Sequence, residues 1–201
     1  GFNLGIKLAT TKYVFISNPD IKITNRSIDE LILCAQKIKK FALIAPTYKI
    51  EKIHKNYSNY SKKIEVDKPF FKKYKILSVN WIDNNFIIKR KLIKNILFDE
   101  NYFLYFETID FCKKLKRERK NLLVSKKIKF IHYGSKSVDI KHKEIVIKSR
   151  AWHYNWSKFY YYRKNFDYFY AFTKILPNLI QAIKKILINL VRFNKFNISL
   201  S

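Results

Sequence analysis

Several residue types are scarce in this chain of 201 residues, and each scarcity narrows what the chain can be. Methionine is absent, so the chain is not a complete, unprocessed translation product, and it begins with apolar residues at helical spacing that follow no strand. We therefore expect that an N-terminal segment is missing. The only cysteines, Cys34 and Cys112, lie far apart in helical patterns. This excludes a disulfide framework or a cysteine metal motif and favours buried thiols in a reducing compartment.

Acidic residues are also scarce, since 15 Asp and Glu stand against 42 Lys and Arg and leave a net charge of +27. Such a charge favours anionic partners, namely nucleic acid, acidic lipid or phosphorylated substrates. Compositional drift is the alternative, because abundant Lys, Asn and Ile with few Gly and Pro is typical of AT-rich coding sequences. The residues given begin with no signal-peptide pattern, which a missing N-terminal segment could still carry, and the longest uncharged apolar stretches near the C-terminus are too short to span a bilayer.

The spacing of apolar residues in the first half predicts an α/β layer. A strand is expected over 13–16, and an amphipathic helix is expected to begin at a capping box formed by Ser27 and Glu30. A short apolar run over 41–45 is then closed by Pro46 and is typical of a buried strand. Strand, helix and strand in this order indicate a sheet covered by helices.

Residues 47–75 are rich in Lys, Tyr, Asn and Ser without a sustained period, and we interpret them as a mobile connection or a lid. The later elements are predicted from short apolar runs and from helical spacing. They are a strand pair over 77–89, a short helix over 92–96, a helix beginning near 107, and strands over 122–124 and 128–132.

The tripeptide Asn18-Pro19-Asp20 stands where the first strand should stop, because proline has no N–H to donate to a sheet. Asp20 would then lie just past the carboxyl end of that strand, and ligands of open α/β sheets bind at that edge. A structural turn is the alternative, since Asn and Asp also bond their own backbone in turns.

Three motifs resemble inverting family-two glycosyltransferases, particularly their rhamnosyltransferase-like branch. The first, GFNLGIKLATTKYVFISNPDIKI, resembles an Asn-x-Gly helix that leads to a strand and then to Asp-x-Asp or Asn-Pro-Asp. The second, VNWIDNNFIIKRKLIKNILFDENYFLYFETIDFCKKL, is similar to the acceptor-site strand followed by Phe-Asp-Glu, aromatic residues and Glu-Asp-x-Asp at a helix start. The third, FIHYGSKS, resembles the strand-end His-x-Gly-x-Ser. Together they cover roughly residues 1–140 in the family's order.

The resemblance implies a GT-A fold, an α/β nucleotide-sugar sandwich that here lacks its first strands and covers residues 1–147. It implies a nucleotide-diphosphate sugar donor, a glycan or polyprenyl-linked acceptor in cell-surface polysaccharide synthesis, and a divalent cation, Mg²⁺ or Mn²⁺. By the same resemblance Asp20 and His132 hold the cation, and Asn3, Asn18 and Asp20 bind the donor.

The resemblance also places the acceptor site and the catalytic acids. Trp81 and Asp83 fall at the acceptor site, although Trp81 can equally be a core residue. Glu107 and Asp110 lie one helical turn apart and are the candidate bases, because the family's usual base position is Thr108 here and a threonine hydroxyl cannot accept a proton near neutral pH. The alternative is that both acids complement the helix dipole, with Asp110 paired to Lys114.

A second departure from the family is Asn84 and Asn85, which stand where small residues are usual. The loss of the usual base at Thr108 leaves a degenerate, non-catalytic sugar-nucleotide binder as an alternative function. A binder of single-stranded nucleic acid is a further alternative, in which aromatic rings stack on bases and lysines follow phosphates. It explains the charge but not the Asn-Pro-Asp motif, the acidic block or His132, so nucleic acid is the less favoured partner.

Residues 148–201 form a basic aromatic tail with a different pattern. An amphipathic helix is predicted over 172–191, with Pro177 in its first turn, a stripe of Leu and Ile on one face and lysines on the remainder. Such a helix can lie in the interface of an anionic membrane, or its stripe can pack on the catalytic domain. We expect a cytoplasmic protein held peripherally at the inner face of the cell membrane.

Overall fold

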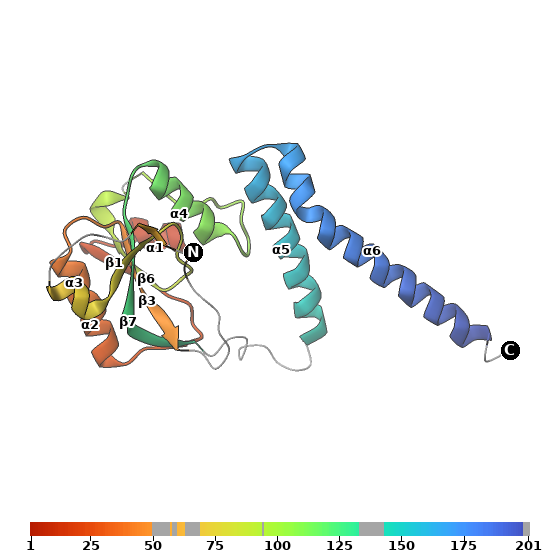
Figure 1. Cartoon of the computed structure of the whole chain (residues 1–201), viewed down its shortest axis with the longest axis horizontal. Helices are drawn as coiled ribbons and strands as arrows, with labels where there is room; N and C mark the ends of the chain where they lie inside the picture. Colours follow the sequence, from red (N-terminus) through yellow and green to blue (C-terminus); the bar gives the residue numbers. More distant parts are fainter. Residues whose placement is uncertain (50–56, 58–59, 63–68, 94, 133–142, 199–201) are drawn as a thin grey trace. The chain divides into compact units, whose positions relative to one another are not determined.

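The computed structural model describes residues 1–49, 57, 60–62, 69–93, 95–132 and 143–198 (Figure 1). The chain forms two compact units, and each is described by itself below. Unit 1 comprises Gly1–Asn101 and Glu107–Lys143, and unit 2 comprises Tyr102–Phe106 and Glu144–Ser201. A five-residue segment therefore leaves unit 1 in the middle of its sequence and belongs to unit 2. The last residues of the FIHYGSKS motif, 133–137, lie outside the described part of the chain.

Unit 1 is an α/β domain built on a mixed seven-stranded sheet, which confirms the predicted class. Six strands lie in the order β1-β6-β3-β7-β5-β4, and β2 pairs with the C-terminal end of β7. β3 and β7 pair in parallel, and the other strand pairs among the described residues are antiparallel. The strands are β1 (Tyr13–Ile16), β2 (Ile21–Lys22), β3 (Leu43–Lys49), β4 (Tyr60–Lys62), β5 (Ile76–Val79), β6 (Phe86–Lys89) and β7 (Leu122–His132).

Helices cover both faces of this sheet because alternate strand residues point to opposite sides. In β6, Phe86 and Ile88 join a core that also contains residues of α1 and α4, whereas Ile87 joins a second core with residues of α2 and α3. Unit 1 is therefore a three-layer sandwich (Figure 1). Its helical elements are α1 (Phe2–Leu8), α2 (Asn25–Lys37), α3 (Pro69–Tyr74), the 3₁₀ turn η1 (Arg90–Leu92) and α4 (Glu107–Arg117).

Pro46 does not end its strand, contrary to the prediction. β3 continues to Lys49, and its pairing with β7 shifts register between Ala45 and Thr47. A proline is tolerated in a sheet at such an irregularity, because the ladder hydrogen bond that it cannot donate is already interrupted there. The extra residues carry Tyr48 toward the end of β7, which has a consequence for the site described below.

Three other predicted boundaries were wrong. The capping box of α2 is formed by Thr24 and Ser27, and Glu30 instead pairs with Arg26 at 3.3 Å. The predicted helix over 92–96 is replaced by η1, and the two strands over 122–132 are one continuous strand. Within residues 47–75, the end of β3, β4 and α3 are regular elements, while 50–56, 58–59 and 63–68 lie outside the description.

Unit 2 consists of two long helices and the aromatic segment Tyr102–Phe106. The helices are α5 (Lys143–Asn165) and α6 (Tyr168–Ile198), so Pro177 lies inside a helix rather than in its first turn. Rings of α5 contact those of the segment, and Ser157 Oγ donates a hydrogen bond of 2.7 Å to the carbonyl oxygen of Leu104. No helix in the described residues is both long enough and apolar enough to cross a membrane.

Candidate functional site

The two predicted metal ligands lie in contact in unit 1. Pairing of β2 with β7 sets Ile21 opposite His132, so that Asp20, one residue earlier, reaches the imidazole. Asp20 Oδ1 lies 3.2 Å from His132 Nε2, and both side chains keep about a quarter of their surface exposed, at 22% and 24%. Pro19 and Asp20 form a turn beyond β1. The structural turn and the candidate ligand site are therefore not exclusive alternatives, because Asp20 belongs to both.

A hydrogen-bonded network supports this pair from the neighbouring strands. The ring of Tyr48 stacks on that of His132, with centroids 5.2 Å apart and planes inclined by 11°. The Tyr48 hydroxyl donates to the carbonyl oxygen of Asn84 at 2.6 Å and accepts from Asn85 Nδ2. Asn85 Oδ1 in turn accepts a bond of 2.7 Å from the backbone N–H of Asn18. The stacked Tyr48 ring, which is itself held by hydrogen bonds, therefore fixes the orientation of the His132 imidazole ring.

Asn85 accounts for one departure from the family pattern. Its side chain is fully buried, and its backbone has φ 77°, in the left-handed region that glycine adopts most easily. Asn tolerates this region better than most residues. The position therefore still satisfies the backbone requirement that a small residue would meet, and its amide also joins β3 to the Asn-Pro-Asp segment.

Glu107 opens α4 with its carboxyl group directed toward the same loop. Thr108 Oγ1 donates to Asn84 Oδ1 at 2.7 Å and lies 3.5 Å from Glu107 Oε1, while the Asn84 side chain also bonds the Glu107 carboxyl. Glu107 Oε2 is buried and accepts no hydrogen bond in the described part of the chain. Burial, assisted by the negative charge of Asp83, raises the pKa of this carboxyl above its ordinary value.

Asp83 directly precedes Asn84, whose groups bond Tyr48 and Thr108. Asp83 Oδ1 accepts a bond of 2.9 Å from the Asn84 N–H, as in a turn. Although part of the side chain meets solvent, desolvation by the surrounding protein raises the pKa of its carboxyl. The hydrogen bond from the Asn84 N–H and the charge of His132 partly oppose this shift. Asn84, the next residue, thus joins the stacked rings of Tyr48 and His132 to Thr108 and Glu107, while Asp20 contacts His132 from β2's side.

The other predicted site residues, described next, make contacts within the fold of unit 1. Asn3 is buried, where its amide donates to the carbonyl oxygen of Phe98 and to Glu100, both at 2.9 Å, and accepts from the Phe98 N–H. Trp81 is half-buried against the hydrophobic core. Asp110 is 1% exposed and pairs with Lys114 at 3.6 Å, as the alternative interpretation of that residue expects.

A divalent cation fits the chemistry of this site only with ligands from elsewhere. In the described ranges no group of three or more His, Cys, Asp and Glu side chains is arranged to hold a metal. Asp20 and His132 offer one carboxylate and one imidazole, a pair that suits Mn²⁺ better than Mg²⁺, since Mg²⁺ prefers oxygen ligands alone. The oxygens of a bound diphosphate could complete such a coordination shell.

Tyr48 was not predicted as a site residue. Its strand was expected to end at Pro46, which left Tyr48 in a supposed loop. The parallel register sets Tyr48 opposite Phe130, two residues before His132. Allowing a bulge at the proline would have placed the ring near the imidazole.

Comparisons with known proteins identify no family. A scan against models of known protein families finds no match, and a search of curated proteins finds no significant one.

Proposed function

We propose that unit 1 binds a nucleotide-diphosphate sugar with a divalent cation and transfers the sugar to an acceptor hydroxyl with inversion. The observation that carries this proposal is the contact of Asp20 with His132 together with the network through Tyr48 and Asn84 that connects this pair with Asp83 and Glu107. These residues come from segments separated by up to 112 residues. A mixed sheet with helices on both faces supports the GT-A assignment as part of the same proposal.

Asp20 and His132 would hold the cation, which would supply stabilisation of the negative charge that develops on the departing diphosphate. Tyr48 fixes the plane of the imidazole by stacking, and Asn85 fixes Tyr48. Such support matters because a ligand that is displaced by even 1 Å loses most of its contribution.

Glu107 would act as the general base. The acceptor oxygen forms a bond to the anomeric carbon while the bond from that carbon to the diphosphate oxygen breaks, and the acceptor proton passes to the Glu107 carboxylate. A raised pKa makes this carboxylate a stronger base than an exposed glutamate. Thr108 and Asn84 orient the carboxyl group, and the lack of a hydrogen bond on its buried Oε2 in the described residues favours the protonated form that the transfer produces.

Mn²⁺-dependent binding of nucleotide sugars tests the proposal directly. The full chain is titrated by calorimetry with uridine, guanosine and thymidine diphosphate sugars, with and without Mn²⁺. We expect at least one to bind more tightly with Mn²⁺, and Asp20→Ala to weaken this binding at least tenfold, which corresponds to about 1.4 kcal/mol. Asp29→Ala, which removes an exposed carboxylate from α2, is the matched control and should leave it unchanged.

The outcomes separate the candidate functions. Binding with transfer or slow hydrolysis of the sugar supports the enzyme, whereas binding without any turnover supports the degenerate binder. Absence of Mn²⁺-dependent binding for the whole panel, or equal affinity of wild type and Asp20→Ala, would overturn the proposal.

We also propose that α6 attaches the chain to an anionic membrane, in keeping with a lipid-linked acceptor and a location at the inner face of the cell membrane. Eight Leu and Ile side chains between residues 176 and 190 are exposed, with Lys174, Lys184 and Lys185 on the same helix. Apolar side chains can enter the acyl layer while lysines meet anionic headgroups.

A further inference from the structure

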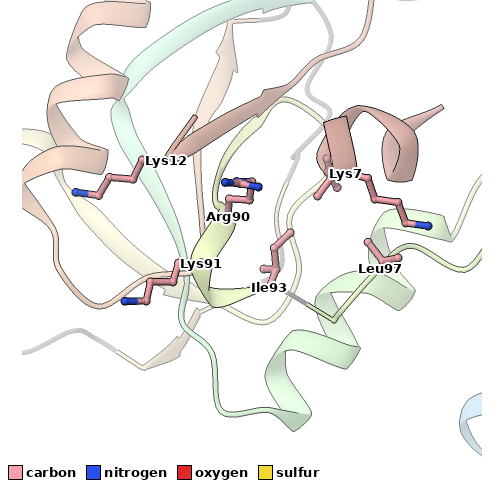
Figure 2. Close-up of a pocket in the computed structure, with 7 residues that line it drawn as sticks. Lys7, Lys12, Arg90, Lys91, Ile93 and Leu97 are labelled. Carbon is pink, nitrogen blue, oxygen red and sulfur yellow. The ribbon is translucent and has the colours of Figure 1, made fainter. Parts of the chain in front are cut away.

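A cavity with a volume of about 560 Å³ lies in unit 1 at the opposite end of β1 and β6 from the candidate site. The register of these strands pairs Tyr13 with Lys89 at this end and Ile16 with Phe86 at the end nearer the Asn-Pro-Asp turn. The cavity is therefore separate from the candidate site. It is lined by Ile6, Lys7, Lys12, Arg90, Lys91, Ile93 and Leu97 (Figure 2).

Four of these lining residues are cations and none is acidic. Among the described residues, none of the four forms an ion pair with a carboxylate. The Lys12 amine instead lies 5.3 Å from the centroid of the Tyr13 ring. Uncompensated positive charges around a concave surface of low dielectric constant focus a positive potential into it. An anion is therefore the ligand that this cavity favours.

Arg90 is held in place before any ligand arrives. Its Nε donates to the carbonyl oxygen of Thr11 at 3.0 Å, and its Nη2 donates to the carbonyl oxygen of Thr10 at 3.3 Å. Its backbone N–H donates to the carbonyl oxygen of Lys12 at 3.1 Å. A guanidinium group has five N–H donors, and these side-chain bonds use two of them. A fixed guanidinium loses little further entropy when it binds a phosphate, which distinguishes it from a free surface lysine.

The cations lie on two sides of Arg90 rather than gathering at one point. Figure 2 shows the amines of Lys12 and Lys91 on one side of Arg90 and the amine of Lys7 on the other. Such a spread suits a ligand with more than one negative charge. Ile6, Ile93 and Leu97 add an apolar wall, which suits a ligand that also carries an apolar group.

We propose that this cavity binds a phosphate or diphosphate ester of an apolar group. The inference does not rest on the proposed transferase activity, because it uses other residues at another edge of the sheet. Two sources can supply this chemistry, a soluble ester or the headgroup of an anionic lipid. The competing explanation is diffuse attraction of any anion to a chain with a net charge of +27.

Titration of the full chain with inorganic diphosphate and with dodecyl phosphate below its micellar concentration tests the charged part of the site. We expect both to bind, and Lys12→Glu with Lys91→Glu to weaken each at least tenfold. Lys127→Glu with Lys37→Glu makes the same change of charge at exposed positions outside the cavity and should leave the affinities within twofold. Far-UV circular dichroism and the thermal midpoint of each variant confirm that the fold is kept.

Absence of binding would overturn the proposal, and equal weakening by the two pairs of substitutions would overturn it in favour of diffuse attraction. A variant of the apolar wall tests the apolar part of the site. Leu97→Ser should weaken the binding of dodecyl phosphate at least threefold and leave the binding of diphosphate unchanged. Equal effects of Leu97→Ser on the two ligands would overturn the apolar half of the proposal.

Vesicles distinguish the two sources. Vesicles of phosphatidylcholine with phosphatidic acid should compete with dodecyl phosphate for the wild-type chain if a membrane headgroup can reach the cavity. Dodecyl phosphate binding that persists unchanged with such vesicles present assigns the site to a soluble ester. Either result supports the shared phosphate chemistry, provided that the Lys12→Glu and Lys91→Glu pair has removed the binding of dodecyl phosphate.

Discussion

Glu107 is the residue on which catalysis in the proposed reaction depends, and its surroundings set the pH at which it can work. Burial and the nearby charge of Asp83 raise the pKa of its carboxyl. The basic form is the deprotonated one, so the rate of transfer should increase as the pH rises through this raised pKa and should reach its plateau above the range of an ordinary glutamate.

Glu107→Gln should lower kcat by about 10²–10⁴-fold, since a positioned general base typically contributes that factor, and should leave binding of the nucleotide sugar unchanged. Thr108→Ser keeps the hydroxyl that bonds Asn84 and is the matched control, for which we expect nearly full activity. A rate of sugar transfer in Glu107→Gln within threefold of wild type, with the pH profile unmoved, would assign the base to another group.

Some of the site could be predicted from single residues and some could not. Asp20 and His132 were expected together from their motifs, and the antiparallel pairing of β2 with β7 brings them into contact. Tyr48 could not be expected while Pro46 was taken to end its strand. The left-handed backbone of Asn85 is a second such case, because no local pattern marks which asparagine adopts it.

At the scale of elements, α6 makes the clearest prediction. Sedimentation with vesicles containing phosphatidylglycerol should carry the chain down, and salt should weaken this binding because screening reduces the attraction of lysines to anionic headgroups. Leu179→Asp with Ile183→Asp places two charges among exposed apolar side chains and should reduce the bound fraction at least fivefold.

Thr173→Asp with Gln181→Asp is the matched control, because it adds the same charge to exposed polar positions of α6. This control pair should bind nearly as well as the wild type. An equal loss of vesicle binding in both pairs of substitutions would show that net charge alone governs the attachment. Full vesicle binding by both pairs would show that the apolar face of α6 plays no part in the attachment.

The elements of unit 1 were predictable in type more than in extent. β1 was expected at its observed bounds, because a proline follows it closely and the apolar run is short. The bounds of β3, η1 and β7 were not, because tertiary pairing overrides local preference there. β7 pairs with β5 over 122–125 and with β3 over 122–124 and 129–131. Between these pairings the Lys126 N–H donates to the carbonyl oxygen of Lys75 and the Ile128 N–H donates to Ser125 Oγ, so that the strand continues through its two lysines.

For the whole molecule, the division of the chain into two units makes a prediction about truncation. Tyr105 and Phe106 have φ 68° and 65°, a left-handed backbone that costs roughly 1–2 kcal/mol in each non-glycine residue. Ring contacts with Tyr154 and Tyr161 of α5 offset this cost. A fragment of residues 1–143 should therefore keep the circular dichroism of an α/β domain and bind more of the dye 8-anilinonaphthalene-1-sulfonate than the full chain does.

Replacing two aromatic rings of the segment in that fragment should return dye binding to the level of the full chain. The variant is Phe103→Ser with Phe106→Ser. The matched control is Phe70→Ser, which lies on α3 and outside the aromatic segment. Dye binding by the fragment no greater than by the full chain would show that these five residues find other partners within unit 1.

The position of Tyr102–Phe106 in the sequence also has a consequence for synthesis on the ribosome. These residues leave the exit tunnel well before Tyr154, Tyr160 and Tyr161, so unit 1 can begin to fold while five residues from its middle have no helix to pack against. At 5–20 residues per second, the roughly 50 intervening residues take about 3–10 s to be added. During those seconds the nascent chain displays an aromatic segment of the kind that chaperones capture, and translation speed over residues 107–165 sets how long that exposure lasts.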